Sequence, residues 1–316
     1  MKYIRLSTTD PYYNLAVEDY LLRNTKEEVF MLWQNAPTVV IGKNQNAYAE
    51  VDLSYAAAHG IRVARRITGG GAVYHDAGNV NYTFITSGTS VGYAPFTRPM
   101  IDALASLGIV AGLSGRNDIE WQGKKISGNA QYVADGRVLH HGTLLFDTDV
   151  ETMSAVLKVD KEKVALRAVP SHRGRVACLA SALPDISVTE FIGRIEKHLL
   201  RETGATPWEL SDGSEIERLR ARNASDAWIF SDKRFLTEYT VTRRRRYSFG
   251  TLSCDVTFSR DAIASVRLSG DFFGNAPIEE LERALVGKTA KTVAFLDPSS
   301  YITGMTADDL ALLLFE

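Results

Sequence analysis

Two adjacent arginines precede three consecutive glycines in the segment Arg65-Arg66-Ile67-Thr68-Gly69-Gly70-Gly71, here called the glycine loop. Ordering three glycines is costly, because glycine loses more backbone freedom on folding than any other residue. Such a run is tolerated where another group must approach the main chain closely. Successive exposed amides form an anion-binding concavity, and arginines supply the complementary charge. The glycine loop is therefore predicted to bind a carboxylate or a phosphate; a flexible hairpin turn is the plainer alternative.

The glycine loop matches neither of the two common nucleotide-binding motifs. The sequence contains no GxxxxGK[ST] motif, which would indicate a P-loop. Tyr74 stands where the last glycine of a GxGxxG dinucleotide fingerprint would be. A nucleotide that binds to this loop must therefore be held by a different scaffold.

A second cluster combines Asp118 with the segment Gly123–Ala130, whose sequence is GKKISGNA. An acidic residue, a turn and a lysine that enters a Ser-Gly strand suit phosphate chemistry, because lysine is a compact cation that can lie between two anions. Asp118 can hold Mg²⁺, which needs only one or two protein carboxylates beside phosphate oxygens. A β-hairpin with solvated lysines at its turn is the alternative, and these residues alone favour neither reading.

Histidine and cysteine usage argues against a protein-built metal centre. His140 and His141 are adjacent in an expected strand, so they point to opposite faces and cannot easily ligate one metal. We expect them to be structural or to line a substrate wall. The two cysteines, Cys178 and Cys254, form no CxxC pair.

The elements that must position these clusters are readable from local signals. Asp10 and Pro11 predict an N-cap and a first helical residue, opening a helix that runs to about Arg23. A strand at residues 61–66 leads into the glycine loop, and strands at 71–74 and 80–85 follow it. The remaining expected elements are strands at 2–6, 29–33 and 38–41, a strand-rich region at 114–147, and helices at 53–59, 97–107, 151–157 and 188–201.

The fold class predicted from this order is α+β, because strands and helices mix irregularly instead of alternating. A chain of 316 residues favours one large and one small domain. We place the large, catalytic domain at residues 1–240 and a small α+β accessory domain at residues 241–316. The accessory domain is expected to contain strands at 239–256 and 264–268 and helices at 278–285 and 307–315.

Composition excludes several classes of protein. Apolar residues make up 45% and charged residues 23%, as in ordinary soluble globular proteins, and the formal net charge of −2 argues against a general nucleic-acid binder. The run Arg243–Arg246 divides between two strand faces without interleaved aromatics, which favours a solvated edge or a surface for an acidic protein. No apolar run approaches the ~18 residues of a membrane span, and the start lacks a signal-peptide core. We expect no membrane association and a cytoplasmic protein.

Taken together, four segments in this order resemble those of lipoate–protein ligases: RRITGGGAVYHDAGNVNYTF, GRNDI, GKKISGNAQ and HHGTLL. The resemblance covers residues 13–183 and continues through SGDFFG at residues 269–274, as in the bacterial ligases that carry a small C-terminal domain. It implies a mixed-sheet catalytic domain of the biotin/lipoate-ligase type.

The resemblance also implies a two-step reaction. ATP and lipoate form lipoyl-AMP and pyrophosphate, with Mg²⁺ as cofactor, and the lipoyl group then passes to a lysine of an acceptor lipoyl domain. The expected acceptors are 2-oxoacid dehydrogenase E2 or glycine cleavage H-type proteins. Lys125 is the expected catalytic residue, and Asp118 is the expected Mg²⁺ ligand. Expected ATP contacts are Arg66, Gly69, Gly70, Gly71, Ala72, Val73, Tyr74, Asn79 and Lys125; expected lipoate contacts are Leu15, Val17, His75, Lys125 and His141.

Two alternatives remain open at the level of the sequence. A lipoyl or octanoyl amidotransferase of the same fold would pass the acyl group through a cysteine thioester, and Cys178, with Arg173 and Arg175 just upstream, is the cysteine placed for it. Cys178 also suits a small buried apolar role. A non-catalytic lipoate-binding protein is the other alternative, and the presence of Lys125 argues against it.

Overall fold

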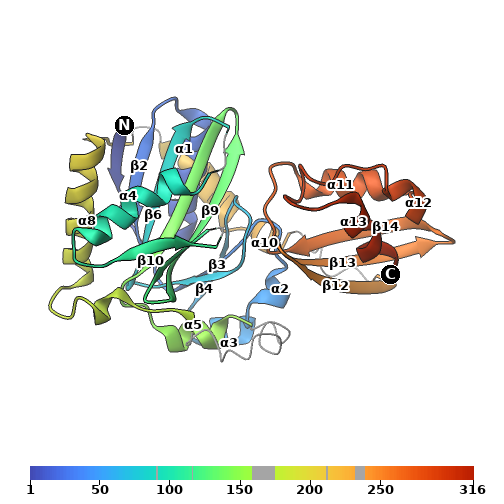
Figure 1. The fold of residues 1–316 in the computed structure, drawn as a ribbon, viewed down its shortest axis with the longest axis horizontal. Helices are drawn as coiled ribbons and strands as arrows, with labels where there is room; N and C mark the ends of the chain where they lie inside the picture. Colours follow the sequence, from blue (N-terminus) through green and yellow to red (C-terminus); the bar gives the residue numbers. More distant parts are fainter. Residues whose placement is uncertain (90–91, 116, 159–174, 211–212, 232–238) are drawn as a thin grey trace. The chain divides into compact units, whose positions relative to one another are not determined.

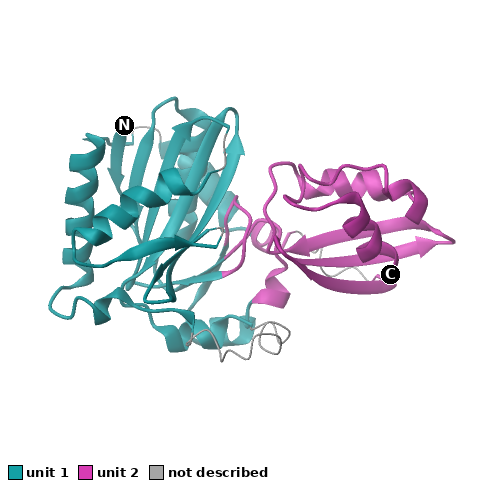
Figure 2. Ribbon diagram, in the orientation of Figure 1, with its two compact units in different colours: residues 1–40, 51–64, 73–225 teal, residues 41–50, 65–72, 226–316 magenta. Residues whose placement is uncertain are grey.

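The computed structural model describes residues 1–89, 92–115, 117–158, 175–210, 213–231 and 239–316 (Figure 1). The chain divides into two compact units, shown in different colours in Figure 2. Unit 1 contains residues 1–40, 51–64 and 73–225, and unit 2 contains residues 41–50, 65–72 and 226–316. The glycine loop thus belongs to the same unit as the C-terminal residues, and the domain boundary at residue 240 stays a prediction.

Unit 1 is built on an eight-stranded mixed sheet. Its parallel part joins β1 to the short β11 and to β2, and the antiparallel part runs from β2 through β6 and β10 to the β9–β8–β7 meander. From edge to edge the strands are β11 (Thr206–Pro207), β1 (Lys2–Arg5), β2 (Val29–Trp33), β6 (Asn79–Ser87), β10 (Arg137–Leu145), β9 (Lys124–Ala134), β8 (Asp118–Trp121) and β7 (Ala111–Ser114).

Helices cover both faces of this sheet (Figure 1). Helices α4 (Ala94–Ala105) and α8 (Val188–Thr203) pack on one face, where Met100 and Phe191 join the sheet residues Phe30 and Tyr82 in the main core. Helix α1 (Pro11–Asn24) contacts β6, β10 and α9 (Gly213–Asn223). Because strand side chains alternate between faces, β10 presents successive residues to α4 and to α1 in turn.

The start of α1 follows from its capping residues, as expected. The Asp10 carboxylate accepts a hydrogen bond from the Tyr12 amide, and Pro11 occupies the first turn, where its missing N–H leaves no donor unpaired. Helix α8 begins in the same way, because Ser187 accepts from the Glu190 amide. Two other helices of unit 1 are short: α3 (Leu53–Ala58) and α5 (Val150–Val156). A small sheet of β4 (Arg62–Arg65), β3 (Thr38–Ile41) and β5 (Val73–His75) flanks the glycine loop in sequence.

Unit 2 carries a three-stranded antiparallel sheet with its own apolar core. The strands are β12 (Val241–Tyr247), β13 (Gly250–Ser259) and β14 (Ala262–Gly270), and Leu252, Cys254 and Val256 of β13 are fully buried. The core is completed by helices α11 (Ile278–Leu285), α12 (Ala290–Val293) and α13 (Ala307–Phe315), while α2 (Ala47–Glu50) and α10 (Asp226–Ile229) come from earlier in the chain.

The α+β fold class is confirmed, and most element predictions agree with the structure within two or three residues. One expected strand, at residues 239–256, is instead two strands joined by a tight turn at Ser248 and Phe249. The turn was not predicted because Phe249, one of its two residues, is apolar and buried, and is not a typical turn former. No helix in the described ranges is both long enough and apolar enough to cross a membrane.

Candidate active site

Lys125 and Asp118 face each other across the β8–β9 hairpin of unit 1. The Nζ atom of Lys125 lies 2.8 Å from Oδ1 of Asp118, and both side chains are about one-third exposed, at 36% and 33%. The hairpin turns at Gln122 and Gly123, which both have positive φ (51° and 73°), as a two-residue type I′ connection requires. The structure therefore brings together the two residues that the sequence assigned to phosphate chemistry.

The glycine at position 128 makes room for the lysine side chain. A Cβ atom added to Gly128 would lie 2.9 Å from Nζ and 3.1 Å from Cε of Lys125, so the end of the lysine side chain would have to move. The lysine therefore lies back over its own strand, above the Ser-Gly pair. On the other side, the Lys125 carbonyl accepts a hydrogen bond from the Ala177 amide at 3.0 Å, which fixes the strand beside residues 176–177.

Arg66 folds back onto the glycine loop in unit 2. Its guanidinium donates to the Gly69 carbonyl at 2.7 Å, to the Gly71 carbonyl at 2.8 Å and to the Thr68 hydroxyl at 2.9 Å. The arginine thus binds two carbonyls and one hydroxyl of the loop to which it belongs. Gly71 is the exposed glycine of the three, and no atom lies closer than 3.9 Å to the position of an added Cβ.

The neighbouring Arg65 has a different task, although the sequence shows the two arginines as an equivalent pair. Arg65 is only 3% exposed. Its guanidinium donates to backbone carbonyls of two segments, at residues 42–45 and 228–229, with donor–acceptor distances from 2.6 to 3.1 Å. Arg65 therefore ties α10 to the turn after β3, and these bonds give it a structural role.

The residues after the glycine loop enter β5. Tyr74 is 4% exposed, and burial raises the pKa of its phenol to about 12, so the hydroxyl stays protonated at neutral pH. His75 is 3% exposed; its Nδ1 atom accepts from the Asn35 amide at 3.1 Å, and its ring lies edge-on to Trp33. Ala72 and Val73, which connect these residues to the loop, are half-buried.

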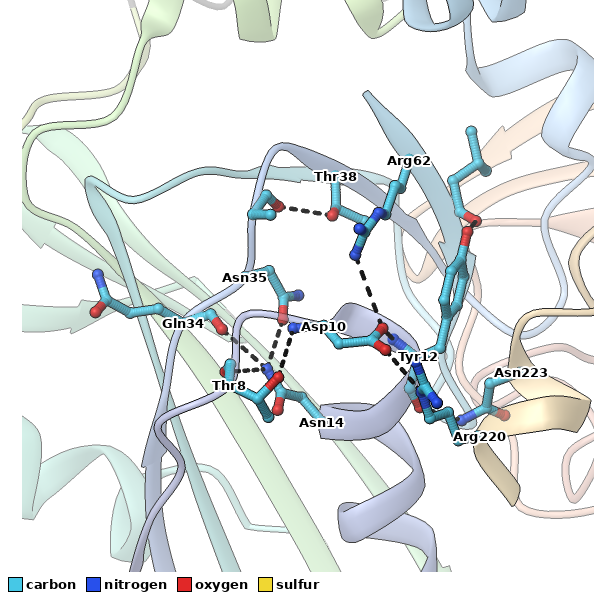
Figure 3. Close-up of polar contacts among 12 residues, drawn as sticks. Thr8, Asp10, Tyr12, Asn14, Gln34, Asn35, Thr38, Arg62, Arg220 and Asn223 are labelled. Carbon is cyan, nitrogen blue, oxygen red and sulfur yellow. Dashed lines mark hydrogen bonds and ion pairs between the residues drawn. The ribbon is translucent and has the colours of Figure 1, made fainter. Parts of the chain in front are cut away.

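The position of Asn35 is set by the first turn of α1 (Figure 3). The Asn14 amide donates to the Asn35 side-chain oxygen at 2.9 Å and to the Thr8 and Gln34 carbonyls. Asp10, at the start of the helix, lies between two arginines and accepts from Arg220 at 2.7 Å. These contacts fix the helix end, and through Asn14 and Asn35 they fix the imidazole of His75.

Asn79 and its neighbour Asn81 leave polar atoms without a partner inside β6. Both residues are at most 1% exposed, and the Asn79 amide donates to the Asn81 oxygen at 3.0 Å. Asn79 Oδ1 and Asn81 Nδ2 have no hydrogen-bond partner in the described part of the chain. A buried donor and acceptor without partners cost free energy unless a water molecule or a polar ligand completes their bonding.

The adjacent histidines do point to opposite faces. His140 is fully buried, stacks on Phe96 of α4, and bonds to Gln131 and Asn129, and burial holds its pKa well below the usual value. His141 instead faces α1, where its Nδ1 atom lies 3.0 Å from the Glu18 carboxylate. The two histidines therefore cannot bind one metal ion together, and His140 belongs to the core.

Glu18 is a buried carboxylate that our sequence analysis missed. It is 1% exposed and accepts hydrogen bonds from His141 and from the Thr83 hydroxyl, which in turn accepts from the Trp33 indole at 2.9 Å. The detectable signal was a glutamate inside the apolar helical run Leu15-Ala16-Val17-Glu18.

The other two expected lipoate contacts lie in the same helix but do not share a face. Leu15 and Val17 are buried at 4% and 0% exposure. Residues two apart in an α-helix project in nearly opposite directions. Leu15 and Glu18 are three apart and share one side, so the polar network at Glu18 lies on the Leu15 side of α1.

No ready-made metal cluster is found in the part of the chain that the structure describes: no three His, Cys, Asp or Glu side chains come together. Asp118 offers one carboxylate, and its neighbour Lys125 is cationic. This donor set fits Mg²⁺ only as a partner of nucleotide phosphates, which would supply the remaining oxygen ligands.

Cys178 is half-buried beside the start of η1 (Leu179–Ser181). Its thiol donates to the Thr148 carbonyl at 3.4 Å, and burial raises its pKa, with the nearby Asp147 and Asp76 adding to the effect. A nucleophilic cysteine needs the opposite shift, toward thiolate. Of the two upstream cations, Arg175 is partly exposed and Arg173 lies outside the described residues.

Comparison with known proteins finds a matching family model for the N-terminal part of the chain and another for the C-terminal part. Residues 10–200 match the family model of the lipoyl protein ligase A/B catalytic domain, and residues 237–314 match the bacterial lipoate protein ligase C-terminus. The lipoate-protein ligase LplJ of Bacillus subtilis is 35% identical over 97% of both chains.

Solved structures agree with this assignment. LipL1 of P. falciparum, solved in complex with lipoate, superposes with a TM-score of 0.77 at 22% identity and covers 94% of each chain, which shows the fold. A lipoate-protein ligase A bound with ATP superposes with a TM-score of 0.59 at 28% identity, covering 75% of this chain and 96% of that one.

Proposed function

The chain belongs to the lipoate–protein ligase family, and on that premise we propose that Lys125, Asp118 and the glycine loop carry its reaction. The enzyme is an ATP-dependent ligase. It activates lipoate to lipoyl-AMP with release of pyrophosphate, and then transfers the lipoyl group to a lysine of an acceptor protein domain.

In the first step a lipoate carboxylate oxygen bonds to the α-phosphorus of ATP. The bond from that phosphorus to the oxygen bridging to the β-phosphate breaks, and pyrophosphate leaves. Two anions must come together, so the protein must neutralise both and hold them in line. Lys125 suits this task because its partly exposed ammonium is already held by Asp118 at 2.8 Å, and this ion pair is the observation that carries the proposal.

The glycine loop supplies the second set of contacts in this proposal. We assign the amides of Gly71, Ala72 and Val73 to the nucleotide, because Arg66 binds the Gly69 and Gly71 carbonyls and Gly71 is exposed. The Gly70 amide already donates to the Phe272 carbonyl, so we assign Gly69 and Gly70 to shaping the loop around ATP. Tyr74 and Asn79 are the further proposed ATP contacts. The orphan atoms at Asn79 and Asn81 offer one acceptor and one donor for a polar ligand. For lipoate, His75 and His141 are the assigned polar contacts, with Leu15 preferred to Val17 as an apolar neighbour of Glu18.

Asp118 is the residue we assign to Mg²⁺. When bound with ATP, the ion would supply positive charge to the phosphate oxygens. The carboxylate of Asp118 also positions the ammonium group of Lys125. In this proposal Asp118 therefore has two roles, holding Lys125 in place and binding the Mg²⁺ ion that accompanies ATP.

The second step needs no nucleophile from the enzyme. The amine of the acceptor lysine attacks the acyl carbon of lipoyl-AMP, AMP leaves, and an amide forms with loss of the ammonium proton. The family acts on lipoate and on acceptor lipoyl domains. Among these, we propose 2-oxoacid dehydrogenase E2 domains or glycine cleavage H-type proteins as the acceptors.

We expect lipoylation to depend strictly on ATP. The purified chain, incubated with lipoate and a panel of apo-acceptor domains, should produce the lipoylated acceptor in intact-mass spectra only when Mg-ATP is added. The physical reason is that a carboxylate is a poor acyl donor until it is joined to a leaving group. A parallel reaction supplies an already lipoylated donor protein without ATP. Acyl transfer in that reaction would support an amidotransferase and would contradict the proposal.

Replacement of the thiol separates the same two routes. Cys178→Ser should retain ATP-dependent ligation at close to the wild-type rate and lose about 1 kcal/mol of unfolding free energy. The rate should be retained because burial raises the pKa of the Cys178 thiol and the thiol donates to a carbonyl, so it is a poor nucleophile. Collapse of turnover in this variant, with loss of an acyl-enzyme adduct seen in the wild type, would show instead that Cys178 is a nucleophile.

A further inference from the structure

The glycine loop is packed against a segment of the C-terminal sheet within unit 2 (Figure 2). This segment, Ser269–Gly274, comprises the last two residues of β14 and the four residues that follow, and has the sequence SGDFFG. The Gly70 amide donates to the Phe272 carbonyl at 3.3 Å, and the Gly270 amide donates to the Asn44 carbonyl at 3.0 Å. Main-chain bonds thus join two parts of the unit that lie about 200 residues apart in the sequence.

Two of the three glycines are required by this packing. A Cβ atom added to Gly69 would lie 2.4 Å from the Phe272 carbonyl oxygen and 3.2 Å from Cα of Phe273. Gly70 has a φ of +89°, a backbone conformation in which residues with a side chain are strained. On the other side of the loop, a Cβ atom added to Gly42 would lie only 2.0 Å from the carbonyl oxygen of Gly70. The backbone of the loop is therefore stacked between two other segments of the same unit.

The Ser269–Gly274 segment is itself held by contacts with several other parts of unit 2. Phe272 is fully buried in the core of unit 2, and the Phe273 carbonyl accepts from the Thr303 amide at 2.7 Å. The Asp271 carboxylate accepts from the Thr251 amide of β13. A Cβ at Gly274 would lie 1.8 Å from the Tyr301 carbonyl oxygen, so this chain crossing is as close as backbones permit.

Phe273 lies over the left-handed glycine. A Cβ added to Gly70 would lie 3.1 Å from Cζ of the phenyl ring and 3.1 Å from Nη2 of Arg66. The ring and the guanidinium thus border the same point of the loop. Arg66 meanwhile donates to the carbonyls of Gly69 and Gly71.

We propose that Phe273 is a positioning residue for the nucleotide, acting through the glycine loop. The Ser269–Gly274 segment holds Gly69 and Gly70 in place, and Phe273 closes the loop over Gly70 so that the Gly71 amide and those after it face the ligand. This inference rests on the proposed function, since it gives the C-terminal sheet a part in ATP recognition. It assigns a role to residues that follow the catalytic-domain match.

The test is Phe273→Ala, compared with the conservative Phe273→Leu. In lipoate-dependent pyrophosphate release, Phe273→Ala should lower kcat/KM for ATP by on the order of 10²-fold, mainly through KM, because a small displacement of a binding loop is enough for such a loss. Transfer from supplied lipoyl-AMP should stay within about threefold of wild type, and Phe273→Leu should restore most of the ATP affinity. The matched control is Phe295→Ala in the same unit, a phenylalanine that is 87% exposed.

Hydrogen exchange gives a second reading that does not need activity. Amides of residues 65–72 should exchange faster in Phe273→Ala than in wild type and in Phe295→Ala, while β9 peptides keep their exchange rates. Normal KM for ATP together with unchanged loop exchange would overturn the inference, and so would equal losses in both half-reactions. A wild-type chain that releases no pyrophosphate would refute the proposed function instead, and the exchange comparison would still decide the role of Phe273. If Phe273→Ala does not fold, Phe273→Val, which also lacks the ring over Gly70 but keeps more apolar volume, carries both measurements.

Discussion

Replacing Lys125 with alanine is expected to lower the rate of lipoyl-AMP formation by on the order of 10²–10³-fold. The substitution removes the ammonium group that lies 2.8 Å from Asp118 and leaves the carboxylate beside the incoming phosphates. Adenylation then lacks the cation assigned to bridge acyl and phosphate oxygens and faces an added repulsion between anions. Stopped reactions that quantify pyrophosphate release at saturating lipoate and ATP measure the effect.

Lys124 offers the matched control for this variant. It precedes Lys125 in β9, is exposed, and points to the opposite side of the strand. Lys124→Ala should therefore release pyrophosphate at close to the wild-type rate. A Lys125→Ala protein within threefold of wild type would show that Lys125 is a solvated hairpin lysine, and the proposed chemistry would need another cation.

Arg65→Ala is expected to destabilise unit 2 by at least about 3 kcal/mol. The substitution leaves five carbonyl oxygens, of Gly42, Lys43, Gln45, Trp228 and Ile229, without their charged donor in a buried place. Hydrogen bonds to a charged group stabilise more than neutral ones, and buried acceptors cannot turn to water. Denaturant unfolding, followed together with amide exchange at residues 41–50, measures the loss.

Arg246→Ala is the control for stability, since this arginine is exposed on β12. It should change the free energy of unfolding by no more than about 0.5 kcal/mol. Equal stability of the Arg65→Ala and Arg246→Ala variants would contradict the structural role of Arg65. It would also reopen the possibility that Arg65 is an anion ligand.

Local chemistry made much of the fold predictable. Asp10 and Pro11 predict the start of α1, and Ser187 and Glu190 predict the start of α8. The turn at Gln122 and Gly123 joins the strands of the β8–β9 hairpin. The pairing of Asp118 with Lys125 follows from that hairpin, because both residues lie within a few positions of its turn. In each of these cases the interacting residues are only a few positions apart in the sequence, so the signal can be recognised without the structure.

Contacts between distant segments were not predictable in the same way. The three glycines suggested close approach by a ligand, but two of them accommodate Phe272 and Phe273, which the sequence places about 200 residues later. The arginines at 65 and 66 look equivalent, yet one binds carbonyls of α10 and the other binds the glycine loop. Glu18 stands within an apolar helical run, but the sequence of that helix does not show that β10 brings His141 to it.

The central claim is that this chain activates lipoate as an adenylate before any acceptor is present. The direct measurement is mass spectrometry of small molecules after the wild-type protein is mixed with lipoate and Mg-ATP alone. Lipoyl-AMP and pyrophosphate should form in equal amounts, should be absent without ATP, and should be reduced at least about 10²-fold with Lys125→Ala. No adenylate from the wild type, under conditions where the same preparation transfers lipoate from a lipoylated donor protein, would contradict it.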